Sequence, residues 1–267
     1  MARTDAEILG REHVDDVDAL AFLSQSNMDA TELAHQVADN ADALFTWDYT
    51  KGERPRLERL YEKAKTSQWN GQTDLPWETE VDPTRLFEGI DFGAMPPTPE
   101  DLAAPAFSPV KNWDDKTWDE FQVESVRWRL SQFLHGEQGA LLCTAKIVET
   151  VPWIDAKYYA ATQVVDEARH VEVFAKYLDE KLGGQYPINV HLGMLLDDII
   201  EDSRWDMTYL GMQIMVEGLA LAAFGLMHET TSEPLLKQLL RYVMSDEARH
   251  VAFGVLCLLY TSDAADE

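Results

Sequence analysis

The stretch DEARHV occurs twice in this chain, at residues 166–171 and again at residues 246–251. Both copies lie in hydrophobic stretches of helical periodicity, where unpaired charge would be costly. A shift of the chain by 80 residues, without a gap, superimposes the two copies and also places Glu137 on Glu217. The repeat therefore predicts two copies of one helical hairpin that carry the same charged side chains.

The spacing within the first hairpin predicts which side chains meet. Glu137 and Glu167 each lie 15 residues from the turn at Pro152, which is roughly 22 Å along a helix. Antiparallel helices therefore bring the two carboxylates to the same height, and the second hairpin repeats the arrangement about its own turn. The six side chains expected to meet between the hairpins are Glu137, Glu167, His170, Glu217, Glu247 and His250.

These six side chains have the chemistry of a metal site. At 100° per residue, the glutamate and histidine of each Glu-x-x-His pair lie about 60° apart on the helix, so both can reach one ion. Four carboxylates and two imidazoles without a thiolate suit iron or manganese. The alternative is a set of buried salt bridges. A third such pair, Glu32 and His35, is interpreted as part of a solvated helix face.

The remaining charged residues of the repeat have expected supporting roles. Metal-bound histidine usually donates its second N–H to a carboxylate. We therefore expect Asp166 and Asp246 each to orient the histidine of the other Glu-x-x-His helix. Arg169 and Arg249 face away from the metals and are expected either to pair with carboxylates of neighbouring helices or to form ion pairs on the helix surface.

The chain is expected to fold as one bundle with an N-terminal extension. Residues 1–112 predict a helical and irregular segment that packs on the bundle through aromatic anchors, and residues 113–256 predict the bundle itself. Residues 257–267 resemble the translation of a sequencing-adapter read. This implies that they are non-native and that the native protein continues beyond about Leu256. The predicted bundle helices are 115–150, 153–182, a short crossover helix at 191–202, 203–230, and a last helix from about 233.

Composition limits the functional classes. The chain has 267 residues, a net charge of −26 and two cysteines, which argues against nucleic acid, anionic membranes and a disulfide scaffold as the basis of function. No secretory signal and no uninterrupted run of 18 apolar residues is present, so a cytoplasmic protein is expected. A cationic stretch, residues 51–65, favours a solvated helix face, with a docking patch for an acidic partner as the alternative.

The ligand pattern resembles that of the ferritin-like superfamily of di-iron carboxylate proteins over residues 115–256. The long N-terminal segment makes the chain more similar to the oxygen-activating oxidase and oxygenase branch than to ferritins. The resemblance implies an all-α, ferritin-like four-helix bundle of two repeated hairpins, a crossover helix and the N-terminal wrap. It does not fix the subfamily, because residues that mark known subfamilies are replaced here by Phe174, Ala140, Met212, Leu221 and Val243.

The resemblance implies an enzyme that uses two iron ions, or one manganese and one iron, with O₂ as co-substrate. Its expected partners are a small, largely apolar organic substrate and an electron-donor protein, and a homodimer is compatible with the sequence. Two alternatives stay open: a ferroxidase or iron-storage protein, and a radical-generating subunit similar to the ribonucleotide reductase small subunit. Apolar rows one turn from the ligands predict a cavity, although core packing explains them equally well. The predicted lining is Phe133, Ala140, Leu141, Gln163, Phe174, Gln213, Ala220, Leu221, Val243 and Gly254.

Overall fold

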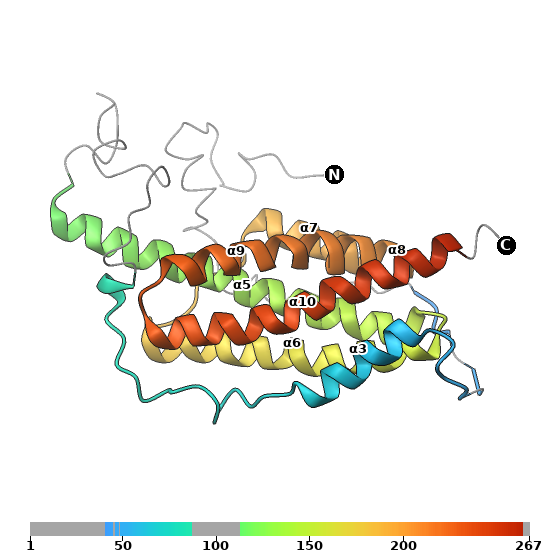
Figure 1. Ribbon diagram of the computed structural model, residues 1–267. Coiled ribbons are helices and arrows are strands. Elements are labelled where there is room, and N and C mark those ends of the chain that lie inside the picture. Colours follow the sequence, from blue (N-terminus) through green and yellow to red (C-terminus); the bar gives the residue numbers. More distant parts are fainter. Residues whose placement is uncertain (1–40, 45, 48, 87–112, 264–267) are drawn as a thin grey trace, which may run out of the picture.

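The computed structural model describes residues 41–86, apart from 45 and 48, and residues 113–263. Regular structure within these ranges is entirely helical, which confirms the predicted fold class. Four long helical arms lie side by side, and a further helix from the N-terminal segment packs against them (Figure 1). The pair Glu32 and His35 and the segment 87–112 lie outside the described residues.

The first hairpin consists of α5 (Asp115–Thr150) and α6 (Ile154–Lys181). The Asp114 carboxylate caps α5 by accepting the backbone N–H of Thr117 at 2.8 Å, which satisfies a donor that the helix leaves unpaired. Pro152 lies in the three-residue turn, and α6 is followed by Gly183 with φ of 81°. The predicted boundaries of these two helices are therefore confirmed to within one residue.

The second hairpin differs from the prediction in its first arm. In place of one α-helix over 203–230, the chain forms α8 (Trp205–Thr208), a π-helical segment η3 (Tyr209–Val216) and α9 (Glu217–Thr230). Hydrogen bonds of π geometry join each residue to the fifth one along, and such segments occur frequently at functional sites. The hairpin is completed by α10 (Pro234–Asp263), which runs into residues 257–267, whose non-native origin stays a prediction.

The two hairpins are joined by α7 (Val190–Glu201), which confirms the predicted crossover helix. Its N-cap is Asn189, whose Oδ1 accepts the backbone N–H of His191 at 2.9 Å. α7 packs on α5, and a glycine permits the close approach. A β-carbon at Gly139 would lie 2.7 Å from the side chain of Leu196.

The described part of the N-terminal segment covers one side of the bundle. Helix α3 (Pro55–Thr66) packs against α6 and α10 (Figure 1). Its Leu57 is fully buried, whereas most of its charged side chains are exposed, in agreement with a solvated helix face. The chain then runs along the bundle to a short 3₁₀ turn, η2 (Pro83–Arg85). It buries Trp69 before this turn and Leu86 directly after it.

One helical stretch, Trp205–Thr230, is long and apolar enough to cross a membrane when only length and composition are considered. About 28 % of its most apolar window is buried inside the protein. The same stretch carries Glu217, which is 2 % exposed and faces the other glutamates of the repeat. The stretch packs against α10 and α5 and is thus an arm of the bundle.

Candidate metal centre

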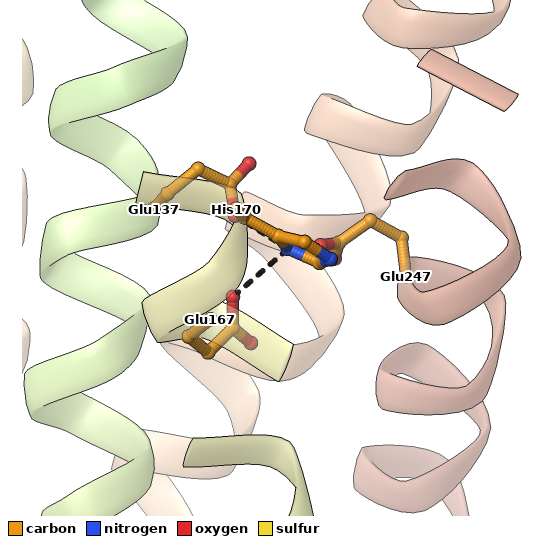
Figure 2. Close-up of side chains that lie close together, drawn as sticks. All are labelled: Glu137, Glu167, His170 and Glu247. Atoms are coloured by element: carbon orange, nitrogen blue, oxygen red, sulfur yellow. Dashed lines mark hydrogen bonds and ion pairs between the residues drawn. The ribbon is translucent and has the colours of Figure 1, made fainter. Parts of the chain in front are cut away.

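The structure brings all six predicted ligands together in the centre of the bundle. Glu137 comes from α5, Glu217 from the junction of η3 and α9, and a Glu-x-x-His pair from each of α6 and α10. None of the six residues is more than 4 % exposed. Figure 2 shows Glu137, Glu167, His170 and Glu247 converging from three helices on the same point.

The six side chains form two overlapping clusters. The first consists of Glu137, Glu167, His170 and Glu247, with one ligand atom of each residue within 4.8 Å of the others. The second consists of Glu167, Glu217 and His250 by the same measure. Glu167 belongs to both clusters, so one carboxylate lies where it can bridge two ions.

In both histidines the same ring nitrogen faces the carboxylates. Nδ1 of His170 lies 3.1 Å from Oε2 of Glu137 and 3.1 Å from Oε1 of Glu247. Nδ1 of His250 lies 3.1 Å from Oε1 of Glu167. The other nitrogen, Nε2, points away from the cluster in each ring. This arrangement presents one nitrogen of each imidazole to a cation and leaves the other for an orienting hydrogen bond.

Several buried atoms at the centre have no hydrogen-bond partner. They are Oε2 of Glu167, Oε2 of Glu217, both carboxylate oxygens of Glu247, and Nδ1 of His250. A buried polar atom without a partner costs about 1–3 kcal/mol, so several in one place indicate a missing binding partner. Four ionised carboxylates carry four negative charges, which two divalent cations would neutralise. The donor set therefore fits a pair of metal ions.

The electrostatics of the metal-free cluster agree with this interpretation. Burial, followed by the nearby charge of Glu247, raises the pKa of Glu137 to about 8. Burial and the charge of Glu167 raise the pKa of Glu217 well above its ordinary value. Burial lowers the pKa of His170, but the carboxylates of Asp246 and of three surrounding glutamates outweigh it and raise that pKa well above the usual range. The raised pKa values favour protons in the place where cations would bind.

Behind the two histidines lies a buried quartet formed by Asp166, Arg169, Asp246 and Arg249, hereafter the Asp–Arg quartet. Each arginine donates hydrogen bonds from Nη2 to both aspartates, over 2.5 to 3.2 Å. The four residues are at most 7 % exposed, so the interpretation of the arginines as surface ion pairs is wrong. Each aspartate also lies within hydrogen-bond distance of the histidine of the opposite helix. Nε2 of His170 lies 3.1 Å from Asp246, and Nε2 of His250 lies 3.4 Å from Asp166.

A cavity of about 250 Å³ adjoins the centre on the side of α5, α7 and α9. Of the predicted lining residues, only Phe133, Ala140 and Ala220 contact it. The residues that the sequence analysis missed are Gln132, Gly136, Leu192, Leu195, Val216, Leu219 and Phe224, and the ligands Glu137, Glu217 and Glu247 complete the wall. Nothing in the repeat identifies the α7 residues, because that helix lies outside both hairpins.

The other predicted lining residues lie elsewhere, because the cavity is confined to one side of the centre. Leu141 and Leu221 are half-buried outside the cavity wall, and Phe174 and Val243 pack in the hydrophobic core. Gln213 hydrogen-bonds Thr144 at 3.3 Å, and Gly254 packs against η3. Gln163 contacts the ligands themselves: its Nε2 donates to Oε1 of Glu167 at 2.9 Å and to Oε1 of Glu217 at 3.0 Å.

Two residues of the N-terminal segment reach the centre and were not predicted. Nε1 of Trp69 donates to Oδ2 of Asp246 at 2.8 Å. Nε2 of Gln68 donates to Oδ1 of Asp166 at 3.0 Å, and its Oε1 accepts from Arg169 at 2.9 Å. Both residues lie far from the repeat in sequence, and no local pattern links them to it. Their tertiary contacts alone identify them.

Comparison with known proteins supports the fold. No family model and no curated protein matches this chain. Among solved structures, the chain is similar to an R2-like ligand-binding oxidase with an aerobically reconstituted Mn/Fe cofactor, with a TM-score of 0.50 and 19 % sequence identity. The match covers 77 % of this chain and 68 % of that one. The chain thus has the ferritin-like fold of the di-metal carboxylate proteins, as the sequence resemblance predicts.

Proposed function

We propose that this protein is a di-metal oxidase or oxygenase that activates O₂ to oxidise a small, largely apolar organic molecule. One observation carries the proposal: a buried set of four glutamates and two histidines, with partnerless ligand atoms, forms one wall of a cavity that is otherwise mostly apolar. A metal pair that only stabilised the fold would need no such cavity beside it.

The ions are proposed to be two irons or one manganese and one iron. Oxygen and nitrogen donors suit both metals, and the similar solved structure is described with a Mn/Fe cofactor. Glu137, Glu167, His170 and Glu247 would hold one ion, and Glu167, Glu217 and His250 the other. When bound, such ions would supply the electrons and the Lewis acidity for the reduction of O₂.

The protein's own residues have three tasks in this reaction. The Asp–Arg quartet holds both imidazoles with Nδ1 directed at the ions. The Gln163 amide bonds one oxygen each of Glu167 and Glu217, so it fixes these carboxylates while leaving their Oε2 atoms without a partner. The apolar walls formed by Phe133 and Phe224 keep water away from the reacting atoms.

The cavity indicates the class of substrate. Among the described residues, the only polar side chain in the lining apart from the ligands is Gln132, whose amide already bonds the backbone of Pro187 and Asn189. No arginine, lysine or histidine lines it among the described residues. Leu195 and Leu219, which line the cavity, are 44 % and 71 % exposed, so access lies between α7 and α9. We therefore propose a neutral, apolar substrate that enters between these helices.

The reaction is tested by oxygen uptake. Metal-free protein loaded anaerobically with two equivalents of Fe(II) is expected to consume O₂ in proportion to its iron and then stop. Further uptake is expected to require a chemical reductant, which stands in for an electron-donor protein. An iron-loaded particle of shell size on gel filtration, with far more iron than two ions per chain, would instead show a storage protein.

The cavity is tested by filling it. Ala220→Phe places a bulky ring in the lining and is expected to abolish stimulation of oxygen uptake by ethylbenzene, a neutral probe, while iron content stays at two per chain. Ala222→Phe, at an exposed position of the same helix, serves as the matched control. Equal stimulation by benzoate, the anionic probe, would contradict the proposed substrate class.

A further inference from the structure

The eighty-residue repeat makes the two metal positions nearly symmetric in sequence, but their surroundings differ. The metal position at His170 has four candidate ligands, His170 included, and the one at His250 has three, His250 included. Two features outside the ligand set break the symmetry further. One is the Trp69 side chain behind His170, and the other is the Gln163 amide beside Glu217.

The first asymmetry lies behind the imidazoles. Oδ2 of Asp246 lies 3.1 Å from Nε2 of His170 and also accepts from Nε1 of Trp69 at 2.8 Å and from Arg169 at 3.0 Å. The corresponding oxygen of Asp166 lies 3.4 Å from Nε2 of His250 and accepts a hydrogen bond from Arg249 at 3.2 Å. Gln68 donates to the other oxygen of Asp166, Oδ1, so the aspartates differ in the oxygen that faces the imidazole. That oxygen of Asp246 has one more donor than that of Asp166 and lies closer to its imidazole.

Trp69 is itself held by two ring contacts. Its ring stacks on Tyr242 at a centroid distance of 4.8 Å and an angle of 18°, and the Arg169 guanidinium lies 4.6 Å from the ring centroid. The side chain is only 9 % exposed. Its N–H therefore has a fixed direction, and the aspartate and imidazole that it supports lose little further freedom when an ion binds.

The second asymmetry lies among the ligands. The Gln163 amide bonds Oε1 of Glu167 and Oε1 of Glu217, which both belong to the His250 cluster. At the equivalent position in the second hairpin the chain has Val243, which packs in the core and offers no hydrogen bond. The amide thus occupies one oxygen of both carboxylates at the His250 position, and of only one carboxylate, Glu167, at the His170 position. An ion at the His250 position therefore meets more competition from the amide.

Both asymmetries act in the same direction. We infer that the two positions fill in order: the His170 position binds its ion first and more tightly, because Trp69 positions the imidazole behind it, and the His250 position fills second, against Gln163. Trp69 is in this sense a positioning residue that belongs to the N-terminal segment. The inference rests on the proposed metal centre and adds an order of occupancy to it.

The order is tested by titration of metal-free protein with Mn(II) under anaerobic conditions, with free Mn(II) followed by electron paramagnetic resonance. Wild-type protein is expected to show two binding steps whose affinities differ by about tenfold or more. His250→Ala is expected to keep the tight step and lose the weak one, and His170→Ala to lose the tight step. Two equal steps in the wild type, or loss of the tight step in His250→Ala alone, would overturn the inference.

Two further variants test whether Trp69 and Gln163 cause the difference in affinity between the two positions. Trp69→Phe keeps an aromatic ring but removes the N–H, and is expected to weaken the tight step about 10–100-fold, the usual effect of losing a partner behind a ligand. Its matched control is Trp77→Phe, since Nε1 of Trp77 donates to the backbone of Gly71. Gln163→Leu is expected to tighten the weak step roughly tenfold, the size of one or two ordinary hydrogen bonds. A tight step unchanged in Trp69→Phe, or a weak step unchanged in Gln163→Leu, would overturn the proposed cause.

The outcomes separate the two proposals. Absence of any Mn(II) binding by wild-type protein whose circular dichroism shows an intact helical fold would overturn the metal centre itself. Two ions bound with equal affinity would leave the centre standing and overturn only the order. Thermal melting of each metal-free variant checks that the binding changes arise at the centre and do not reflect unfolding.

Discussion

Gly254 of α10 lies so close to Gln213 of η3 that a β-carbon at position 254 would sit 2.7 Å from Cβ of Gln213. The π segment that precedes Glu217 thus packs directly on the helix that carries Glu247 and His250. Gly254→Ala is expected to destabilise the protein by about 1–3 kcal/mol, because a methyl group there forces the two helices apart. Urea unfolding of the metal-free protein measures the effect.

The control for this substitution is Gly225→Ala on α9, where a β-carbon would meet nothing within 4 Å. Replacement of an unhindered helical glycine by alanine is expected to stabilise by up to about 1 kcal/mol. If both variants gain stability, the contact between α10 and η3 is not the reason for the glycine.

Stability of the metal-free protein is expected to fall as pH rises from about 5 to 8. The pKa of Glu137 rises from its ordinary 4.5 to about 8 on folding through burial and the nearby Glu247, and the pKa of Glu217 rises likewise. The folded state therefore binds more protons than the unfolded state in this window. Each such group contributes stability that is fully present below pH 4.5 and is lost towards the folded pKa, at up to about 1.4 kcal/mol per pH unit.

Urea unfolding in the presence of a chelator, repeated across this pH range, measures the dependence. Glu137→Gln removes one of the titrating groups and is expected to make the decline shallower. Stability that rises between pH 5 and 8 in the wild type would show that the carboxylates of the empty centre do not hold protons.

The Asp–Arg quartet is expected to be a large contributor to stability. Arg249→Ala leaves Asp166 and Asp246 buried with less compensating charge, and loss of one member of a buried ionic group typically costs about 3–5 kcal/mol. Lys116→Ala removes one partner of an exposed pair with Glu120, 84 % and 64 % exposed, and is expected to change stability by less than about 1 kcal/mol. Equal effects in urea unfolding would contradict the role of the quartet.

Glu167 belongs to both ligand clusters, so Glu167→Ala is expected to reduce the content of both ions, whereas Glu217→Ala spares the ion at the His170 position. Glu172→Ala, an exposed glutamate further along α6, is the control with unchanged content. Elemental analysis after gel filtration gives the stoichiometry. Retention of two ions per chain in Glu167→Ala would remove this residue from the site.

The bundle and its central side chains follow from the sequence because both depend on regular spacing. Pro152 and Gly183 mark helix ends by local chemistry alone, and two ungapped copies of one hairpin place the glutamates and histidines at one height. These features need only the rise and twist of an α-helix. The structure accordingly brings all six predicted ligands together.

The cavity could not be predicted in the same way. The residues one helical turn from the ligands surround the centre on all sides, but the cavity lies only towards α5, α7 and α9. Because the segment before Glu217 is π-helical, the residue one turn before Glu217 is not the one that an α-helix would place there. Gln213, predicted to line the cavity, instead hydrogen-bonds Thr144. Trp69 reaches the centre through tertiary packing across 177 residues of sequence to Asp246, and no periodicity within the chain encodes that contact.

The ungapped register of the two hairpins restricts how the length of this chain can change during evolution. One residue inserted between Glu137 and its turn would displace that carboxylate by about 1.5 Å along the helix and rotate it by about 100°, away from its partners. The crossover at residues 182–204 connects the hairpins without setting the height of a ligand, so an insertion outside the packed helix α7, at the exposed Ser203 and Arg204, would leave the ligands in register. Natural insertions and engineered fusions are thus expected to be tolerated there and to abolish metal binding within the hairpin arms.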